Sequence, residues 1–149
     1  CFNRRWLEHV YERESTRCAF NGQPLSMLML DVDHFKAYND QHGHLAGDYA
    51  LCLVAHTLRN QLRPKDSMVR YGGEEFVILM PGASLEEARL QCEFMRQGVG
   101  LLPIGLPVSV SIGLAARSRD DTWETLFRRA DQALYEAKRS GRDRVVAAA

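Results

Sequence analysis

The chain has 149 residues, a length that suits one domain with a single continuous core. Apolar residues make up 46% and charged residues 26%, a balance typical of a globular protein rather than a disordered one. The formal net charge is zero, which excludes a global basic field that would attract nucleic acid or an anionic membrane. We therefore expect no nucleic-acid partner and no direct membrane contact, and any phosphate site must be local.

The cysteines and the apolar runs indicate where the protein is located. Four scattered cysteines without a CxxC pair argue against a disulfide framework and against a zinc site. Cys52 and Cys92 lie in helical patterns, where we expect small buried side chains. No apolar run approaches the roughly 18 residues of a membrane-spanning helix, and no signal peptide opens the chain. We expect a cytoplasmic domain, and a region before this chain is where the parent protein would hold any membrane anchor.

The first half of the chain predicts a helix, a buried strand and two more helices. Residues 6–15 have an amphipathic pattern, and a turn follows at 21–24. The apolar run 25–30 predicts a strand that is buried on both faces. Residues 35–42 predict a short helix that is broken at Gly43, and the longer helix that follows stops before Pro64.

The second half of the chain opens with a predicted hairpin. Its strands, 67–71 and 76–80, are joined tightly through Gly72-Gly73, because both glycines accept positive φ. Asp121 with Glu124 predicts a capping box at the start of the last helix, which Gly141 is placed to end. The remaining expected elements are a helix, a strand and an edge strand, at residues 84–96, 108–115 and 145–146.

This order of elements predicts an α+β fold with a ferredoxin-like βαββαβ core. The simplest packing places the helices of this core, at 35–62 and 84–96, on one face of a mostly antiparallel sheet. In that topology the first and third strands are adjacent and antiparallel. Asp31 and Asp33, at the end of the first strand, would then lie beside Glu74 and Glu75, at the start of the third. We therefore predict four carboxylates at one rim of the sheet.

The predicted carboxylate cluster favours a divalent cation. Asp31 and Asp33 point to the same face of a strand, and like charges this close are costly unless they are paired or protonated. Mg²⁺ takes carboxylate and phosphate oxygens as ligands and would relieve the repulsion. A solvated loop beside ordinary hairpin glutamates is the alternative interpretation.

Several neighbouring residues are candidates for nucleotide binding. The Gly72-Gly73 turn allows a bulky ligand to approach the backbone, although an ordinary hairpin turn has the same composition. Asn39 and Asp48 are suited to guanine, since a carboxylate accepts from its N1–H and exocyclic amine, or they are helix caps. The cations in reach of a phosphate, each otherwise a solvated surface residue, are Lys36, Lys138 and Arg142.

Segments along nearly the whole chain resemble the GGDEF family of diguanylate cyclases. The family signature, in its GGEEF form, corresponds to Arg70-Tyr71-Gly72-Gly73-Glu74-Glu75-Phe76. Further similar blocks, at matching separations, are Asp31-Val32-Asp33-His34-Phe35-Lys36, Asn39-Asp40, Gly43-His44 through Gly47-Asp48, Ser109-Val110-Ser111-Ile112-Gly113, Ala130-Asp131, Ala133-Leu134-Tyr135, Ala137-Lys138 and Gly141-Arg142. The family's opening Leu-Thr-Gly segment is missing before Asn3-Arg4. The resemblance implies one GGDEF domain over residues 1–149, cut from a longer protein with an N-terminal regulatory region. It also implies a fold similar to nucleotide cyclase and polymerase palm domains.

The resemblance implies an activity, the condensation of two GTP molecules into cyclic di-GMP with release of pyrophosphate. Mg²⁺, or Mn²⁺ in its place, would be held by Asp31, the Val32 carbonyl, Glu74 and Glu75. Glu74 would also be the catalytic group nearest the attacking 3′-hydroxyl. Substrate phosphates would be held by Lys36, Lys138 and Arg142, the guanine and ribose by Asn39, His44 and Asp48, and the nucleotide would lie close to Gly72 and Gly73.

The resemblance also implies partners and regulation. One site of this kind holds one GTP, so a symmetric product requires a homodimer. Arg63 and Asp66 match an inhibitory site for cyclic di-GMP, and an exposed salt pair is the alternative interpretation. Two other functions compete with the cyclase. One is a catalytically silent GGDEF domain that senses GTP or cyclic di-GMP, and the other is an enzyme with a different nucleotide product.

Overall fold

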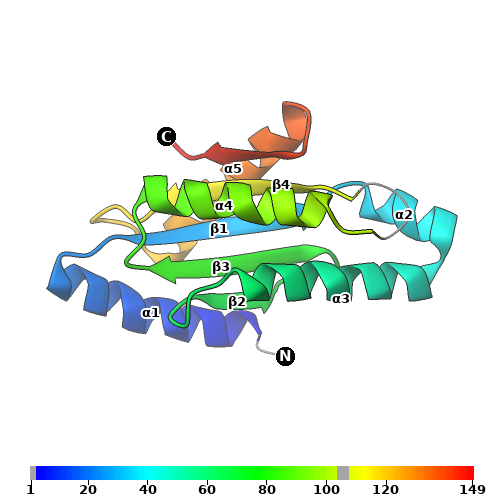
Figure 1. Cartoon of the computed structure of the whole chain (residues 1–149). Coiled ribbons are helices and arrows are strands. Elements are labelled where there is room, and N and C mark those ends of the chain that lie inside the picture. Colours follow the sequence, from blue (N-terminus) through cyan, green and yellow to red (C-terminus); the bar gives the residue numbers. More distant parts are fainter. Residues whose placement is uncertain (1–2, 104–107) are drawn as a thin grey trace.

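The computed structural model describes residues 3–103 and 108–149, which form five helices and five strands (Figure 1). In chain order these are α1 (Arg4–Asn21), β1 (Leu25–Val32), α2 (Phe35–His42), α3 (His44–Asn60), β2 (Ser67–Arg70), β3 (Glu75–Pro81), α4 (Leu85–Gly100), β4 (Val110–Ala116), α5 (Trp123–Arg139) and β5 (Arg144–Ala147). The predicted order of helices and strands is confirmed, including the edge strand.

The strands form one sheet in the order β2-β3-β1-β4-β5. β1 lies between β3 and β4 and is antiparallel to both, as the ferredoxin-like arrangement predicts. β5 extends the sheet parallel to β4. The register places Asp31 of β1 opposite Glu75 of β3, so the acidic end of one strand lies beside the acidic start of the other.

The helices of the βαββαβ core lie on one face of the sheet, as predicted, whereas α1 and α5, which lie outside that core, cover the other face. Leu28 and Leu30 of β1 pack in a core with α3 and α4, whereas Met27 and Met29 pack in a second core with α1 and α5. Figure 1 shows α3 and α4 on the near side of the sheet and α5 behind it. All eight residues of β1 are buried. A strand that is apolar on both faces needs a helical layer on each, because uncovered apolar surface is unfavourable in water.

Capping residues make α1 longer than the predicted 6–15. The Asn3 side chain accepts a hydrogen bond from the backbone N–H of Trp6 at 3.0 Å, which fixes the start of the helix. Gly22 ends it in the left-handed conformation, with φ of 68°. Both are local signals, and they extend the helix well beyond its clearest amphipathic stretch.

The capping box of α5 is formed by Thr122 and Thr125 and not by Asp121 and Glu124. Asp121 lies in the preceding turn, where its carboxylate accepts from the Ser118 backbone N–H at 2.8 Å and from the Thr125 hydroxyl at 2.8 Å. The prediction was therefore displaced by one residue, because both Asp and Thr are favourable N-caps.

Two expectations from composition have different outcomes. Cys92 is buried as predicted, but Cys52 is exposed, because it lies on the outer side of α3 away from Leu51 and Val54. Within residues 3–103 and 108–149, none of the helices combines the length and the apolar character needed to cross a membrane.

Candidate active site

The predicted convergence of acidic residues at one rim of the sheet is confirmed. Asp31 and Glu75 are register partners, and the Val32 backbone N–H donates to the Glu74 carbonyl at 3.1 Å, which ties the two strand ends together. An open pocket of about 180 Å³ lies at this rim. It is lined by Asp31, Val32, Asp33, His34, Glu74, Lys138 and Arg142.

Burial and mutual repulsion disfavour negative charge at this rim. Burial raises the pKa of the Asp31 carboxyl above its ordinary value, the hydrogen bond and charge of Lys138 oppose this shift, and the charge of Glu74 reinforces it. Burial also raises the pKa of Glu75, and the negative charge of Asp31 adds to the effect. A nearby cation would stabilise the ionised form of these carboxyl groups.

In this structure an ammonium group provides that cation. Lys138 of α5 forms an ion pair with Asp31. In the described part of the chain, no three His, Cys, Asp or Glu side chains already converge as a metal-ligand set. The donor chemistry nevertheless fits Mg²⁺, since the pocket offers the carboxylates of Asp31 and Glu74 beside the backbone of Val32, and Mg²⁺ prefers oxygen ligands.

The signature turn is held by an arginine for which the sequence predicts no role. The Arg70 guanidinium donates to the Gly72 carbonyl at 3.3 Å and to the Gly73 carbonyl at 2.6 and 3.0 Å. Neither glycine has positive φ, so the predicted reason for a glycine pair is wrong. A Cβ on Gly73 would meet no atom within 4 Å, so the protein itself does not require glycine there, and the backbone lies open to a ligand.

The three candidate phosphate-binding cations separate into two groups. Lys138 and Arg142 both line the pocket, as predicted. Arg142 is held with φ of 64°, a left-handed conformation that is uncommon for a residue with a Cβ. Lys36 is exposed in the first turn of α2 and does not line the pocket. It would reach a phosphate only through its long flexible side chain.

The candidate base-recognising residues lie on α2 and α3. A Cβ on Gly47 would lie 2.8 Å from Cγ of Asn39 and closer still to its Oδ1, so glycine at this position leaves room for the Asn39 side chain as it lies here. The buried Asn39 Oδ1 has no hydrogen-bond partner among the described residues. Asp48 and His44 are exposed near the start of α3. An unpaired buried acceptor beside an exposed carboxylate suits a ligand that donates hydrogen bonds.

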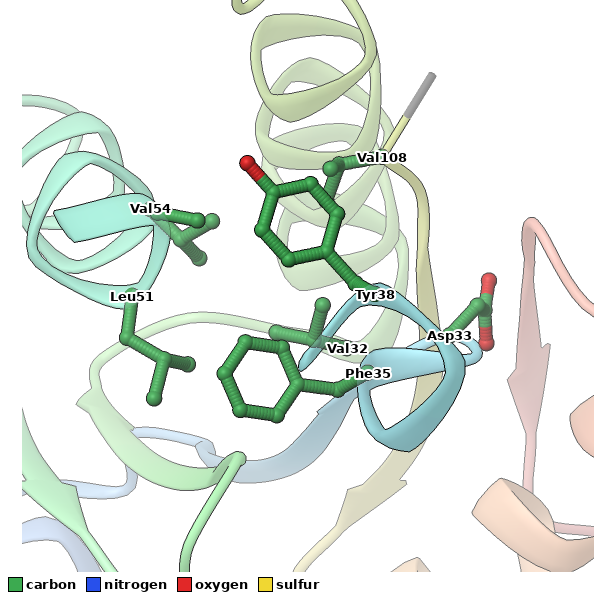
Figure 2. A pocket seen from close by; sticks show the side chains of 8 residues that line it. Val32, Asp33, Phe35, Tyr38, Leu51, Val54 and Val108 are labelled. Atoms are coloured by element: carbon green, nitrogen blue, oxygen red, sulfur yellow. The ribbon is translucent and has the colours of Figure 1, made fainter. Parts of the chain in front are cut away.

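A small apolar cavity of about 40 Å³ lies behind the rim, between α2 and α3 (Figure 2). The Phe35 and Tyr38 rings are stacked with centroids 6.3 Å apart and point toward Leu51 and Val54 of α3. The cavity is large enough for water but too small for a purine. The side chains that line this cavity pack α2 against α3, and the cavity does not offer room for a base.

Arg63 and Asp66 form an ion pair that is separate from this pocket. The Arg63 guanidinium donates to Asp66 Oδ1 at 2.8 Å and to the Pro81 carbonyl at 2.9 Å. The Asp66 side chain is fully buried, whereas that of Arg63 is 37% exposed. Asp66 therefore orients Arg63 here, and only Arg63 faces solvent.

Comparison with known proteins places the chain in a family. The family model described as "Diguanylate cyclase, GGDEF domain" matches residues 1–144. Diguanylate cyclase DgcP of Pseudomonas aeruginosa is 45% identical over 148 residues, which cover 96% of this chain and 22% of that protein. Diguanylate cyclase DgcM of Escherichia coli is 43% identical over 148 residues, which cover 98% of this chain and 36% of that protein.

A solved structure agrees with these matches. The GGDEF domain of DgcB from Caulobacter crescentus, in complex with c-di-GMP, matches with a TM-score of 0.92 at 32% identity, covering 97% of this chain and 90% of that one. The chain spans 22% and 36% of the length of the two curated relatives described above. Since the family model matches all but the last residues, the chain belongs to the GGDEF family of diguanylate cyclase domains.

Proposed function

We propose that this domain condenses two GTP molecules into cyclic di-GMP and two pyrophosphates. The observation that supports this most strongly is the acidic rim, where Asp31 and Glu74 line a pocket together with Lys138 and Arg142. Carboxylates and cations beside one open turn suit a nucleoside triphosphate, whose phosphates need both bound metal and positive side chains. A silent sensor would not need the full set of signature acids, and this chain retains Asp31, Glu74 and Glu75.

In the proposed reaction the 3′-hydroxyl oxygen of one GTP attacks the α-phosphorus of the other. A phosphorus–oxygen bond forms, the bond to pyrophosphate breaks, and Glu74 accepts the hydroxyl proton. Glu74 suits this role better than Glu75, because Glu74 lines the pocket whereas Glu75 is paired in register with Asp31. Lys138 and Arg142 hold the departing phosphates, and Lys36 contributes from α2.

The cofactor in this proposal is Mg²⁺, with Mn²⁺ as a substitute. The groups that would hold it are Asp31, the Val32 carbonyl, Glu74 and Glu75. When bound, it would neutralise phosphate charge and lower the pKa of the attacking hydroxyl. Lys138 would then exchange its bond to Asp31 for a phosphate oxygen.

Base selection in this proposal depends on the α2–α3 unit. The Asn39 side chain, held against Gly47, and the Asp48 carboxylate accept from guanine donors that adenine does not present together. His44 lies beside the ribose. ATP would leave these polar groups without hydrogen-bond partners, and a site of this kind discriminates strongly against such a substrate.

Two further features belong to the same proposal. A second copy of the domain faces the first, since each rim holds one GTP and the product contains two. Cyclic di-GMP inhibits by binding at Arg63, whose exposed guanidinium offers donors to a phosphate or to a guanine edge. Asp66 keeps that guanidinium in place through the ion pair, or leaves the ion pair and accepts a hydrogen bond from guanine.

The test is pyrophosphate release from GTP in the presence of Mg²⁺, measured together with the nucleotide product. We expect two pyrophosphates for each cyclic di-GMP, and little release from ATP. GTP binding without pyrophosphate would favour the silent sensor. Both cyclase reactions release one pyrophosphate for each GTP consumed, so a nucleotide product other than cyclic di-GMP, such as a cyclic mononucleotide, would favour the other enzyme class.

A further inference from the structure

The carboxylate of Asp33 is directed away from the α2–α3 cavity. Figure 2 shows it pointing away from Phe35 and Tyr38, toward the side of the molecule where β5 runs. The residue is 9% exposed. Its Oδ1 accepts from the Ser111 hydroxyl at 2.6 Å, and its Oδ2 accepts from the Ser109 hydroxyl at 2.6 Å. Asp33 is therefore occupied by protein donors from the start of β4.

A third donor connects Asp33 to the turn between α5 and β5. The backbone N–H of Asp143 donates to Asp33 Oδ2 at 3.1 Å. Arg142 and Asp143 have φ of 64° and 47°, so two consecutive residues with a Cβ adopt the left-handed conformation. Such a conformation persists only where the surroundings hold it. Arg96 of α4 holds the same turn from the other side, through an ion pair with the Asp143 carboxylate at 2.9 Å.

This turn presents Arg142 to the pocket at the rim. The Arg142 backbone N–H donates to the Ala137 carbonyl at 2.9 Å, so the turn continues directly from the end of α5. Its side chain lines the same pocket as Asp31 and Glu74. Any change in the Arg142–Asp143 backbone would move the guanidinium relative to the carboxylates.

We propose that Asp33 is a positioning residue for phosphate binding and not a metal ligand. It holds the left-handed Arg142–Asp143 turn through the Asp143 N–H, and so fixes Arg142 over the pocket. The proposal rests on the proposed function in one respect, the role of Arg142 as a phosphate ligand. The requirement for a carboxylate follows from its three donors, since the single oxygen of an amide cannot accept from all of them.

The first test needs no nucleotide. Amide hydrogen exchange at Asp143 is measured by NMR in the parent, in Asp33→Asn and Asp33→Ala, and in the matched control Asp120→Asn, an exposed acid in the loop before α5. We expect exchange to accelerate about tenfold or more in the Asp33 variants, because the turn opens locally without its acceptor. The control should not change. An exchange rate at Asp143 equal to that of the parent, in a folded Asp33→Asn variant, would overturn the proposal. If Asp33→Ala does not fold, the test rests on Asp33→Asn alone.

The second test measures affinity for a non-hydrolysable GTP analogue with Mg²⁺, by calorimetry. We expect Asp33→Asn and Arg142→Ala each to weaken binding about tenfold, and the double variant to be no weaker than the worse single one, because both act on one contact. Additive losses would overturn the proposal. The proposal would also be overturned if Asp33→Asn needed more Mg²⁺ for binding and Arg142→Ala did not. That result would identify Asp33 as a metal ligand. Since the readout is affinity, a domain that binds the analogue but makes no product would refute the proposed activity alone.

Discussion

The substitution Gly113→Ala should damage both the stability and the activity of the domain. Gly113 lies in β4, where α5 packs directly against the strand. A Cβ at this position would lie 2.7 Å from Cα of Leu134 and closer still to the Leu134 nitrogen and the Ala130 carbonyl oxygen. All three atoms belong to the α5 backbone, so a side-chain rotation cannot relieve the clash.

The size of the effect follows from this geometry. An ordinary contact of 3.4 Å with Leu134 Cα requires α5 to retreat by at least about 0.7 Å. Overpacking of this kind costs about 1–3 kcal/mol, which lowers the Tm of a domain of this size by roughly 2–12 °C. The same helix brings Lys138 to Asp31. A misplacement near 1 Å at the site is expected to lower turnover by about a hundredfold.

The assay is thermal unfolding followed by dichroism, together with product formation from GTP well below the Tm. Gly100→Ala is the matched control, because the same change at the exposed end of α4 meets no atom within 4 Å. Alanine suits a helix better than glycine, so the control should be as stable as the parent or slightly more stable. If Gly113→Ala unfolds at the parent temperature with parent activity, the close packing of α5 on β4 is not what positions the site.

Four further predictions address the acids of the rim, the proposed base site and the Arg63–Asp66 ion pair. Glu74→Gln should retain the parent Tm and lose at least about a hundredfold in turnover, and near-normal activity in a folded variant would refute its role. Gly47→Ala should displace the Asn39 side chain and narrow the preference for GTP over ATP, measured as the ratio of the two kcat/KM values; an unchanged ratio would contradict it. Because the folded-state pKa of Glu75 is raised, its contribution to stability is fully present below its ordinary pKa of 4.5 and is lost as pH rises through the raised value. Glu75→Gln should therefore raise the Tm at neutral pH but not below pH 4.5, and a lower Tm at neutral pH would count against the assigned direction. Calorimetry with cyclic di-GMP should detect binding to the parent and not to Arg63→Ala, and equal affinities would leave the ion pair as a structural feature only.

Much of the fold was predictable because the decisive signals are local. The apolar run of β1 ends abruptly at Asp31, and this one boundary, with the βαββαβ order, was enough to predict the acidic rim. The helices of that core were predictable as one layer, and α1 and α5 form a second layer on the other face. The same run predicts a strand that is buried on both faces, and full burial requires helices on both sides. The second helical layer therefore follows from the same apolar run, although the order of the core elements indicates only the first.

The parts of the site that were not predictable depend on tertiary contacts. Nothing near Asp33 in the sequence indicates that its acceptors are satisfied by Ser109, Ser111 and the Asp143 N–H, more than 70 positions away along the chain. The Ser-x-Ser spacing in β4 was a signal, since alternate strand residues share a face. The role of Arg70 was hidden in the same way, because its partners are backbone carbonyls.

The measurement that tests the central claim most directly is product identification by mass spectrometry after the purified domain is incubated with GTP and Mg²⁺. The proposed function predicts cyclic di-GMP, with a rate per mole of protein that rises with protein concentration because two domains must face each other. Glu74→Gln, in the same preparation, should yield almost none. Bound GTP that is recovered unchanged at every protein concentration would contradict the proposed enzymatic function.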